Sequence, residues 1–140
     1  MVETTLTWKE KFTFLTELDN HEFILDVSKE GGGDDRGPRP KGLILSALGA
    51  CTGMDVVSIL EKMKFKDFKF QLKVSAETED THPMVFKKAL LSYIFEGDSL
   101  KPDSLKKAVN LSKDKYCAVS AMLQKAFEIE VKIMLNGEEI

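Results

Sequence analysis

The stretch SALGACTGMDVV, residues 46–57, decides how the chain is interpreted, because it places a cysteine among glycines where a helix is otherwise indicated. Small residues recur three or four positions apart along one side of that predicted helix: Ser46, Gly49, Ala50 and Gly53. Glycine in a helix interior costs about 1 kcal/mol relative to alanine, so a compensating contact is expected. The stripe is consistent with close packing against a second helix and equally with a cleft that gives a reagent access to Cys51.

The helix that contains this stretch is predicted to be apolar on nearly all sides. Pro40 is expected in its first turn, and the helix should run to about Met63. The run Leu43–Leu60 reaches the length of a membrane span, but Asp55 near its middle would be costly in hydrocarbon. We therefore expect no membrane span, and a helix buried in a core or in a subunit interface.

The rest of the chain predicts strands on both sides of this helix and one further helix. Antiparallel β structure is expected over residues 3–27, with a turn at Asp19-Asn20, followed by a Gly/Pro-rich loop at 31–42. Strands are expected at 68–78, 84–97 and 127–135, and alternation in the first places Phe70 and Val74 on its inward face. A second helix should follow Pro102, with one mostly apolar face formed by Leu105, Val109, Ser112, Tyr116, Val119 and Leu123. The order β-β-α-β-β-α-β predicts one α+β domain over residues 1–140, with an antiparallel sheet and two helices.

Composition excludes several classes of function. A net charge of −3 argues against a nucleic-acid binder, because phosphate neutralisation needs an excess of clustered cations. Two cysteines are too few for a disulfide framework, so we expect a cytoplasmic protein. His21 and His82 have no cysteine or second histidine at ligand spacing, so no metal is expected, and no dinucleotide or phosphate-loop spacing indicates a cofactor.

The second cysteine lies in KYCAVS, residues 115–120, late in the second predicted helix. Taken alone, Cys117 is best interpreted as a small buried hydrophobic residue. If the two helices pack together, however, its sulfur could meet that of Cys51. A cytoplasmic dithiol that meets in space usually carries out redox chemistry.

A reactive thiolate needs a nearby cation, and the two arginines of the chain are the candidates. Among 20 basic residues the only arginines are Arg36 and Arg39, both in the loop GGGDDRGPRPKG just ahead of the Cys51 helix. A guanidinium can hold a carboxylate, for which Asp34 and Asp35 are candidates, and still donate to a thiolate or peroxide oxygen. The alternative is a solvated loop whose charges have no special role. Asp55, one turn beyond Cys51, would oppose a thiolate at Cys51 if it faced the Cys51 sulfur.

Two motifs carry a resemblance to a known family. GPRPKGLILSALGACTGMDVVSILEKM, followed by KYCAVSAML at residues 115–123, resembles the OsmC/Ohr family, particularly its OsmC-like branch. The resemblance implies an OsmC-like fold and an intertwined homodimer with two long central helices and active sites at the subunit interface. It also implies reduction of organic hydroperoxides, with Cys51 as the peroxidatic thiol, Cys117 as the resolving thiol and a dithiol as the reductant.

The chain departs from the family pattern in the groups that activate the thiol. Where the peroxidases have a glutamate near the start of the helix, this chain has Lys41-Gly42, and the N-terminal strands offer lysines in place of the usual arginine. Arg36 or Arg39 could substitute. Many relatives have proline after the second cysteine, and this chain has Ala118. The alternative function is therefore a non-catalytic OsmC-like protein that binds a small apolar ligand at the dimer interface.

Overall fold

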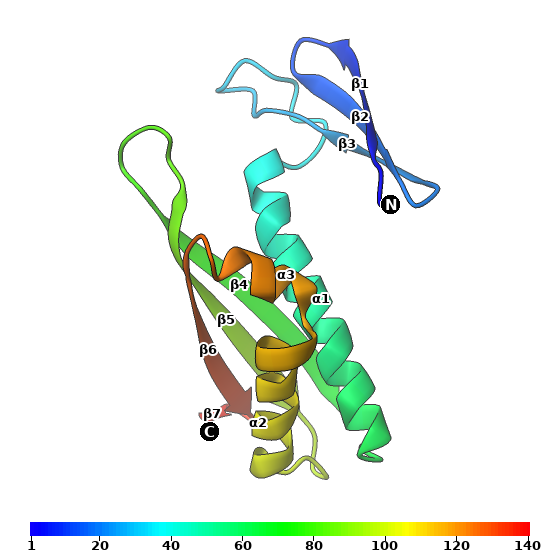
Figure 1. Ribbon diagram of the computed structural model, residues 1–140, viewed down its shortest axis with the longest axis vertical. Coiled ribbons are helices and arrows are strands. Elements are labelled where there is room, and N and C mark those ends of the chain that lie inside the picture. The colour runs from blue at the N-terminus through cyan, green and yellow to red at the C-terminus, as the bar shows by residue number, and fades with distance from the viewer. The chain divides into compact units, whose positions relative to one another are not determined.

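The computed structural model describes residues 1–140 and divides them into two compact units, Met1–Ile44 and Leu45–Ile140 (Figure 1). We describe each unit by itself. The α+β class predicted from the sequence is confirmed, because both units contain β-sheets and the second also contains helices. The organisation of residues 1–140 as a single domain stays a prediction.

The N-terminal unit is a three-stranded antiparallel sheet in the order β1-β2-β3. Its strands are β1 (Thr5–Glu10), β2 (Thr13–Leu18) and β3 (His21–Leu25). The sequence predicted two strands here, but Lys11 adopts a φ of 48° and turns the chain after β1, so a third strand forms. The predicted turn at Asp19-Asn20 is confirmed, since both residues have positive φ, as a tight hairpin requires.

Helix α1 (Pro40–Lys62) begins at Pro40, as predicted, and buries only one of its faces. The buried residues are Leu48, Gly49, Thr52, Val56 and Leu60. Met54 is 71% exposed and Val57 36%, so one side of this apolar helix is not covered within one chain, and its burial in a subunit interface stays a prediction. By length and hydropathy alone α1 could cross a membrane, a test that core helices of soluble proteins also pass.

The sheet of the C-terminal unit has the order β4-β5-β6-β7 and is mixed. Its strands are β4 (Lys69–Thr78), β5 (Phe86–Glu96), β6 (Glu128–Leu135) and the short β7 (Glu138–Glu139), which the sequence did not predict. Strands β5 and β6 run parallel, whereas the other pairs are antiparallel. The prediction of an antiparallel sheet is therefore wrong for this pair, because the helical segment between them acts as a crossover connection.

The second predicted helix is broken into three parts. Helix α2 (Pro102–Leu111) continues into one π-helical turn, η1 (Ser112–Tyr116), and α3 (Ala118–Leu123) follows. Cys117 lies between them with extended backbone angles, φ −76° and ψ 104°, rather than inside a helix. The wider turn shifts the side-chain register, so Tyr116 is 53% exposed instead of facing the core.

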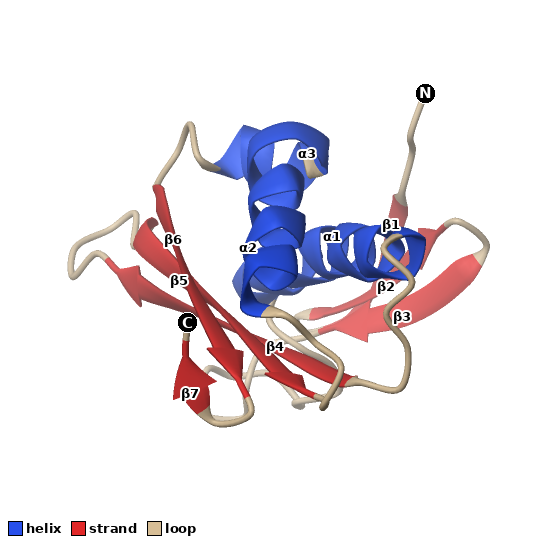
Figure 2. Ribbon diagram, turned by 90° about the horizontal axis from the view of Figure 1, so that it is seen from below, coloured by secondary structure: helices blue, strands red, loops and turns tan.

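The core of the C-terminal unit lies between the helices and one face of the sheet (Figure 2). The glycine stripe on α1 faces β4: a Cβ on Gly49 would lie 2.9 Å from Val74 Cγ2, and one on Gly53 would lie 3.8 Å from Phe70 Cε2. Close packing therefore explains Gly49, although its neighbour is a strand and not the second helix. Phe70 and Val74 are partly buried, which confirms the predicted inward face of β4.

Candidate functional site

The two cysteines meet within the C-terminal unit. Cys51 lies in α1 and is partly exposed, whereas Cys117 is only 2% exposed. Their side chains are close enough for Cys51 to raise the pKa of the Cys117 thiol, and neither thiol is in a disulfide. The structure thus brings together two sulfurs that are far apart in the sequence and gives one of them access to solvent. Their catalytic roles stay predictions.

The break between η1 and α3 holds Cys117 in place. The Cys117 N–H donates to the carbonyl oxygen of Ser112 at 2.8 Å, which ends the π turn. Cys117 is also the N-cap of α3, where its Sγ accepts a hydrogen bond from the Ser120 N–H at 3.3 Å. The sulfur therefore replaces the hydroxyl or carboxylate oxygen that usually caps a helix. This geometry fixes the Cys117 side chain from both sides of the break.

The surroundings of Cys117 favour the neutral thiol. Burial raises its pKa from 9.0 to about 11, although the Ser120 N–H opposes this rise. The neighbouring Cys51 side chain and the negative charge of Asp55 raise the pKa further. At neutral pH Cys117 is therefore a protonated donor beside the more accessible Cys51. Asp55 thus disfavours a thiolate at Cys117, whereas the expected effect of Asp55 on Cys51 stays a prediction.

A buried network of hydroxyl groups joins α1 to β5 and η1 next to the cysteine pair. Thr52 Oγ1 lies 2.6 Å from Tyr93 Oη and 2.9 Å from Ser112 Oγ, and Ser112 donates to Asp55 Oδ2 at 3.0 Å. Thr52, Tyr93 and Ser112 are each 0% exposed. Sequence analysis missed this network. The available signal was that Ser112 interrupts an otherwise apolar helix face, just as Thr52 interrupts the apolar run of α1.

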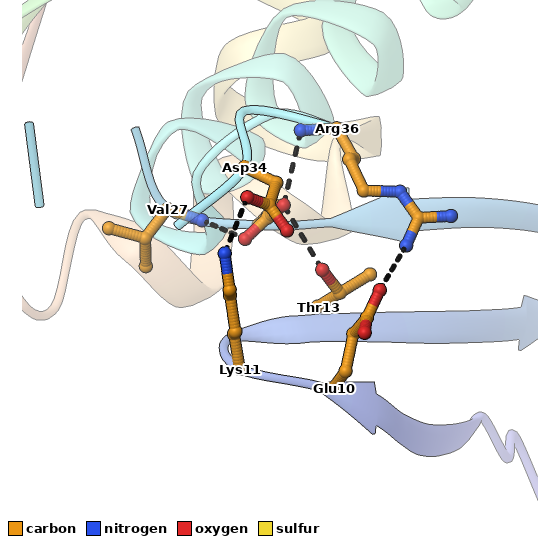
Figure 3. Close-up of polar contacts among 7 residues, drawn as sticks. Glu10, Lys11, Thr13, Val27, Asp34 and Arg36 are labelled. Atoms are coloured by element: carbon orange, nitrogen blue, oxygen red, sulfur yellow. Dashed lines mark hydrogen bonds and ion pairs between the residues drawn. The ribbon is translucent and has the colours of Figure 1, made fainter. Parts of the chain in front are cut away.

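The two arginines lie in the N-terminal unit, where each is paired with a carboxylate. Arg36 Nη1 lies 3.6 Å from Glu10 Oε1, and Arg39 Nη1 lies 2.6 Å from Asp35 Oδ1. Asp35 was one of the predicted carboxylate partners; the other, Asp34, binds Lys11 Nζ at 2.9 Å instead (Figure 3). The loop is therefore an ordered network of ion pairs. The assistance of either arginine to Cys51 stays a prediction.

Asp26 is the residue that organises this loop, and sequence analysis did not single it out. It is 1% exposed, and its carboxylate accepts hydrogen bonds from Val27 N (2.7 Å), Arg36 N (3.1 Å) and Thr13 Oγ1 (3.1 Å). Figure 3 shows these donors converging from β2 and the loop. Burial alone raises the pKa of Asp26, but the donated hydrogen bonds outweigh it and hold the pKa below 3.8.

The exposed side of α1 forms an open apolar groove with β4. The groove has a volume of about 480 Å³, and its lining residues are Ala50, Gly53, Met54, Val57, Ser58, Glu61 and Phe70. It begins at Ala50, the residue next to Cys51. The groove lies along the same helix as the close packing at Gly49, and a cleft that gives a reagent access to Cys51 stays a prediction. No group of three or more His, Cys, Asp or Glu side chains is arranged to hold a metal ion.

Comparison with known proteins supports a family assignment. The profile described as OsmC-like protein matches residues 32–132. Protein YhfA of Escherichia coli K12, whose name gives no activity, is 35% identical over 129 residues, covering 91% of this chain and 93% of that protein. A hypothetical protein from Aquifex aeolicus has a similar structure, with a TM-score of 0.86, 26% identity and coverage of 99% and 98% of the two chains. An organic hydroperoxide resistance protein from Legionella pneumophila shares the fold, with a TM-score of 0.67, 15% identity and 96% coverage of both chains. The chain therefore belongs to the OsmC-like family.

Proposed function

We propose that this protein reduces organic hydroperoxides with the cysteine pair Cys51 and Cys117. The observation that carries the proposal is the contact between a partly exposed sulfur and a buried one, made by residues from α1 and from the break before α3. Accessibility supports these roles, because Cys51 is partly exposed whereas Cys117 is only 2% exposed. Membership of a family that includes organic hydroperoxide resistance proteins supports the same chemistry.

The proposed cycle has three balanced steps. The Cys51 thiolate attacks one oxygen of the hydroperoxide, the O–O bond breaks, and the leaving alkoxide takes a proton to become the alcohol. Cys51 is then a sulfenic acid, and Cys117 attacks its sulfur, forming a disulfide and releasing water. An external dithiol reduces the disulfide and is itself oxidised. We expect the apolar groove along the exposed side of α1 to favour hydroperoxides with fatty or aryl groups over hydrogen peroxide.

A homodimer is part of this proposal. Met54 and Val57 are exposed on an apolar helix that one chain covers on one face only, and large exposed apolar surfaces usually mark an interface. A second copy of α1 would cover part of this side and form the opposite wall of the groove. Gel filtration at several protein concentrations tests this directly: a folded monomer throughout would contradict the dimer, whereas Met54→Lys should weaken it.

Titration of free thiols tests the peroxidase. One equivalent of cumene hydroperoxide should consume both thiols of the wild type, at a rate well above that of free cysteine. Cys51→Ser should leave Cys117 unreacted, because the buried thiol at 2% exposure is protonated and shielded. Cys117→Ser should still lose Cys51, but as a sulfenic acid that a dimedone reagent traps. Retention of both thiols in the wild type would contradict the proposal.

The groove supports a second candidate, a non-catalytic protein that binds a small apolar ligand. In that case an environment-sensitive dye should bind near Ala50 and Met54 with the same affinity in the wild type and in Cys51→Ser. The two candidates separate cleanly. Dye binding without consumption of thiols by hydroperoxide favours the binding protein, whereas stoichiometric thiol loss favours the peroxidase.

A further inference from the structure

The hydroxyl network beside the thiols has a defined hydrogen-bond direction. A carboxylate can only accept, so Ser112 donates its proton to Asp55 Oδ2 at 3.0 Å. Ser112 Oγ must then accept from Thr52 Oγ1 at 2.9 Å, and Thr52 Oγ1 in turn accepts from Tyr93 Oη at 2.6 Å. Thr52 and Ser112 thus each donate once and accept once, and Tyr93 donates at the start of the network. Such a buried set of connected hydrogen bonds resists rearrangement.

The hydroxyl network is connected to both cysteines through the backbone. Thr52 directly follows Cys51 in α1, so any rotation or shift of Thr52 moves the neighbouring thiol. Ser112 accepts the N–H of Cys117 on its carbonyl oxygen at 2.8 Å, and its hydroxyl joins the network at the same time. Thr52 and Ser112 are therefore the pair through which α1 and the π turn are held in register.

A π turn and an extended residue are weakly determined by local forces, so they need support from the tertiary structure. Ser112 provides it at the first residue of η1, and it is fully buried. A buried serine hydroxyl adds nothing to the packing of an apolar core, and its burial costs free energy unless the hydroxyl is hydrogen-bonded. The polar side chain at this position is thus explained by positioning and not by packing.

We propose that Thr52 and Ser112 are positioning residues that hold the Cys51 and Cys117 sulfurs at disulfide-forming distance. The inference rests on the proposed two-cysteine function and deepens it, because it concerns the step that joins the two sulfurs. Without the Thr52–Ser112 bond, the break before α3 is free to move relative to α1. The reduced pair then forms its disulfide less favourably, although each thiol remains chemically unchanged.

The test is the equilibrium between the protein dithiol and glutathione disulfide, which gives the protein disulfide and reduced glutathione. The fraction of disulfide is measured by alkylation and mass spectrometry in buffers of known glutathione ratio. Thr52→Val removes the hydroxyl at nearly constant shape, and Ser112→Ala removes it from the other partner. Each should lower the equilibrium constant for disulfide formation about 10-fold, as expected for loss of a buried hydrogen bond.

Two matched controls separate positioning from a general loss of packing. Thr52→Ser loses a methyl group but keeps the hydroxyl, and it should stay within about twofold of the wild type. Ser75→Ala removes a hydroxyl from the exposed face of β4 and should have no effect. Urea unfolding under the same conditions confirms that each variant is folded. Equal constants for the wild type, Thr52→Val and Ser112→Ala would overturn the inference, as would a loss in Thr52→Ser equal to that in Thr52→Val.

The experiment contains no hydroperoxide, so it does not depend on peroxidase activity. If the wild type fails to consume cumene hydroperoxide but the variants still shift the glutathione equilibrium, the peroxidase proposal fails and the positioning role stands. If the wild type forms no Cys51–Cys117 disulfide at any glutathione ratio, the positioning role is overturned.

Discussion

The two units of the chain are stabilised in different ways. The C-terminal unit has a core of fully buried apolar side chains, which include Leu91, Phe95 and Leu105. In the N-terminal unit the most buried side chains are mainly polar, namely Thr13, Thr16 and Asp26, with Leu25 as the apolar exception. Several of its large apolar side chains are exposed, namely Leu6, Trp8, Phe12, Phe14 and Phe23.

The two units therefore depend on different interactions for their stability. Burial of apolar area drives folding, so the C-terminal unit carries most of the free energy of unfolding. The N-terminal unit relies on the carboxylate of Asp26 to hold together the loop that carries Arg36. The cysteine pair lies in the first kind of environment and both arginines in the second. Substitutions in each unit should therefore respond to different conditions.

The largest expected effect is the removal of a core aromatic side chain. Phe95→Ala should lower the free energy of unfolding by about 3–5 kcal/mol, because Phe95 is 0% exposed and stacks on Phe70 at 4.5 Å. Leu6→Ala, at a position 49% exposed in the N-terminal unit, should change it by only about 0.5 kcal/mol. Urea unfolding measures both. Similar losses for the two variants would contradict the contrast between the units.

Alkaline pH should destabilise the C-terminal unit through Cys117. Its pKa rises from 9.0 to about 11 on folding, so the native state keeps a proton that the unfolded state has lost. The stabilisation is complete below pH 9 and disappears as the pH rises through 11, by at most about 1.4 kcal/mol per pH unit. Cys117→Ala should show a shallower decline of the free energy of unfolding over this range. Parallel curves for the two proteins would contradict the prediction.

Acid should act on the N-terminal unit through Asp26. Its pKa is lowered on folding, so its stabilising contribution is present above 3.8 and is lost as the pH falls through the lowered value. Trp8 is the only tryptophan and lies in this unit, so its fluorescence reports the transition. Asp26→Asn should remove the dependence on this group and loosen the unit at neutral pH. Asp34→Asn is the matched control at an exposed ion pair and should have little effect.

The smallest effect concerns the two glycines of α1. Gly53→Ala should stabilise the protein by up to about 1 kcal/mol, because alanine is the better helix former and its Cβ would lie 3.8 Å from Phe70 Cε2. Gly49→Ala should gain nothing, since its Cβ would lie 2.9 Å from Val74 Cγ2. Thermal unfolding compares the two. A larger gain for Gly49→Ala would show that the packing of α1 on β4 is looser than described.

Much of the fold could be predicted from sequence because local signals were strong. Pro40 set the start of α1, the alternation in residues 69–78 set the inward face of β4, and Asp19-Asn20 set a hairpin turn. The parallel pairing of β5 with β6 could not be predicted, because strand order depends on tertiary packing. The π turn at Ser112 was missed for a similar reason, since a helical spacing of apolar residues does not reveal an inserted residue.

The two cysteines of the candidate site could be singled out from the sequence, but the hydroxyl groups that lie beside them could not. Cysteines are rare, so Cys51 and Cys117 could be singled out from two short motifs. Threonine and serine are common, and nothing local marks Thr52 or Ser112 as partners 2.9 Å apart. The buried Asp26 was equally inconspicuous in a chain with 23 acidic residues. A polar residue inside an apolar pattern, such as Thr52 or Ser112, indicates a buried hydrogen-bond partner.

The central claim is that Cys51 and Cys117 work as one redox pair. The most direct test is peptide mass spectrometry of the wild type after one equivalent of cumene hydroperoxide. We expect a disulfide between the peptides that contain Cys51 and Cys117, with cumyl alcohol formed in equal amount. A dithiol should reduce this disulfide again. Unchanged hydroperoxide with both cysteines still reduced would contradict it.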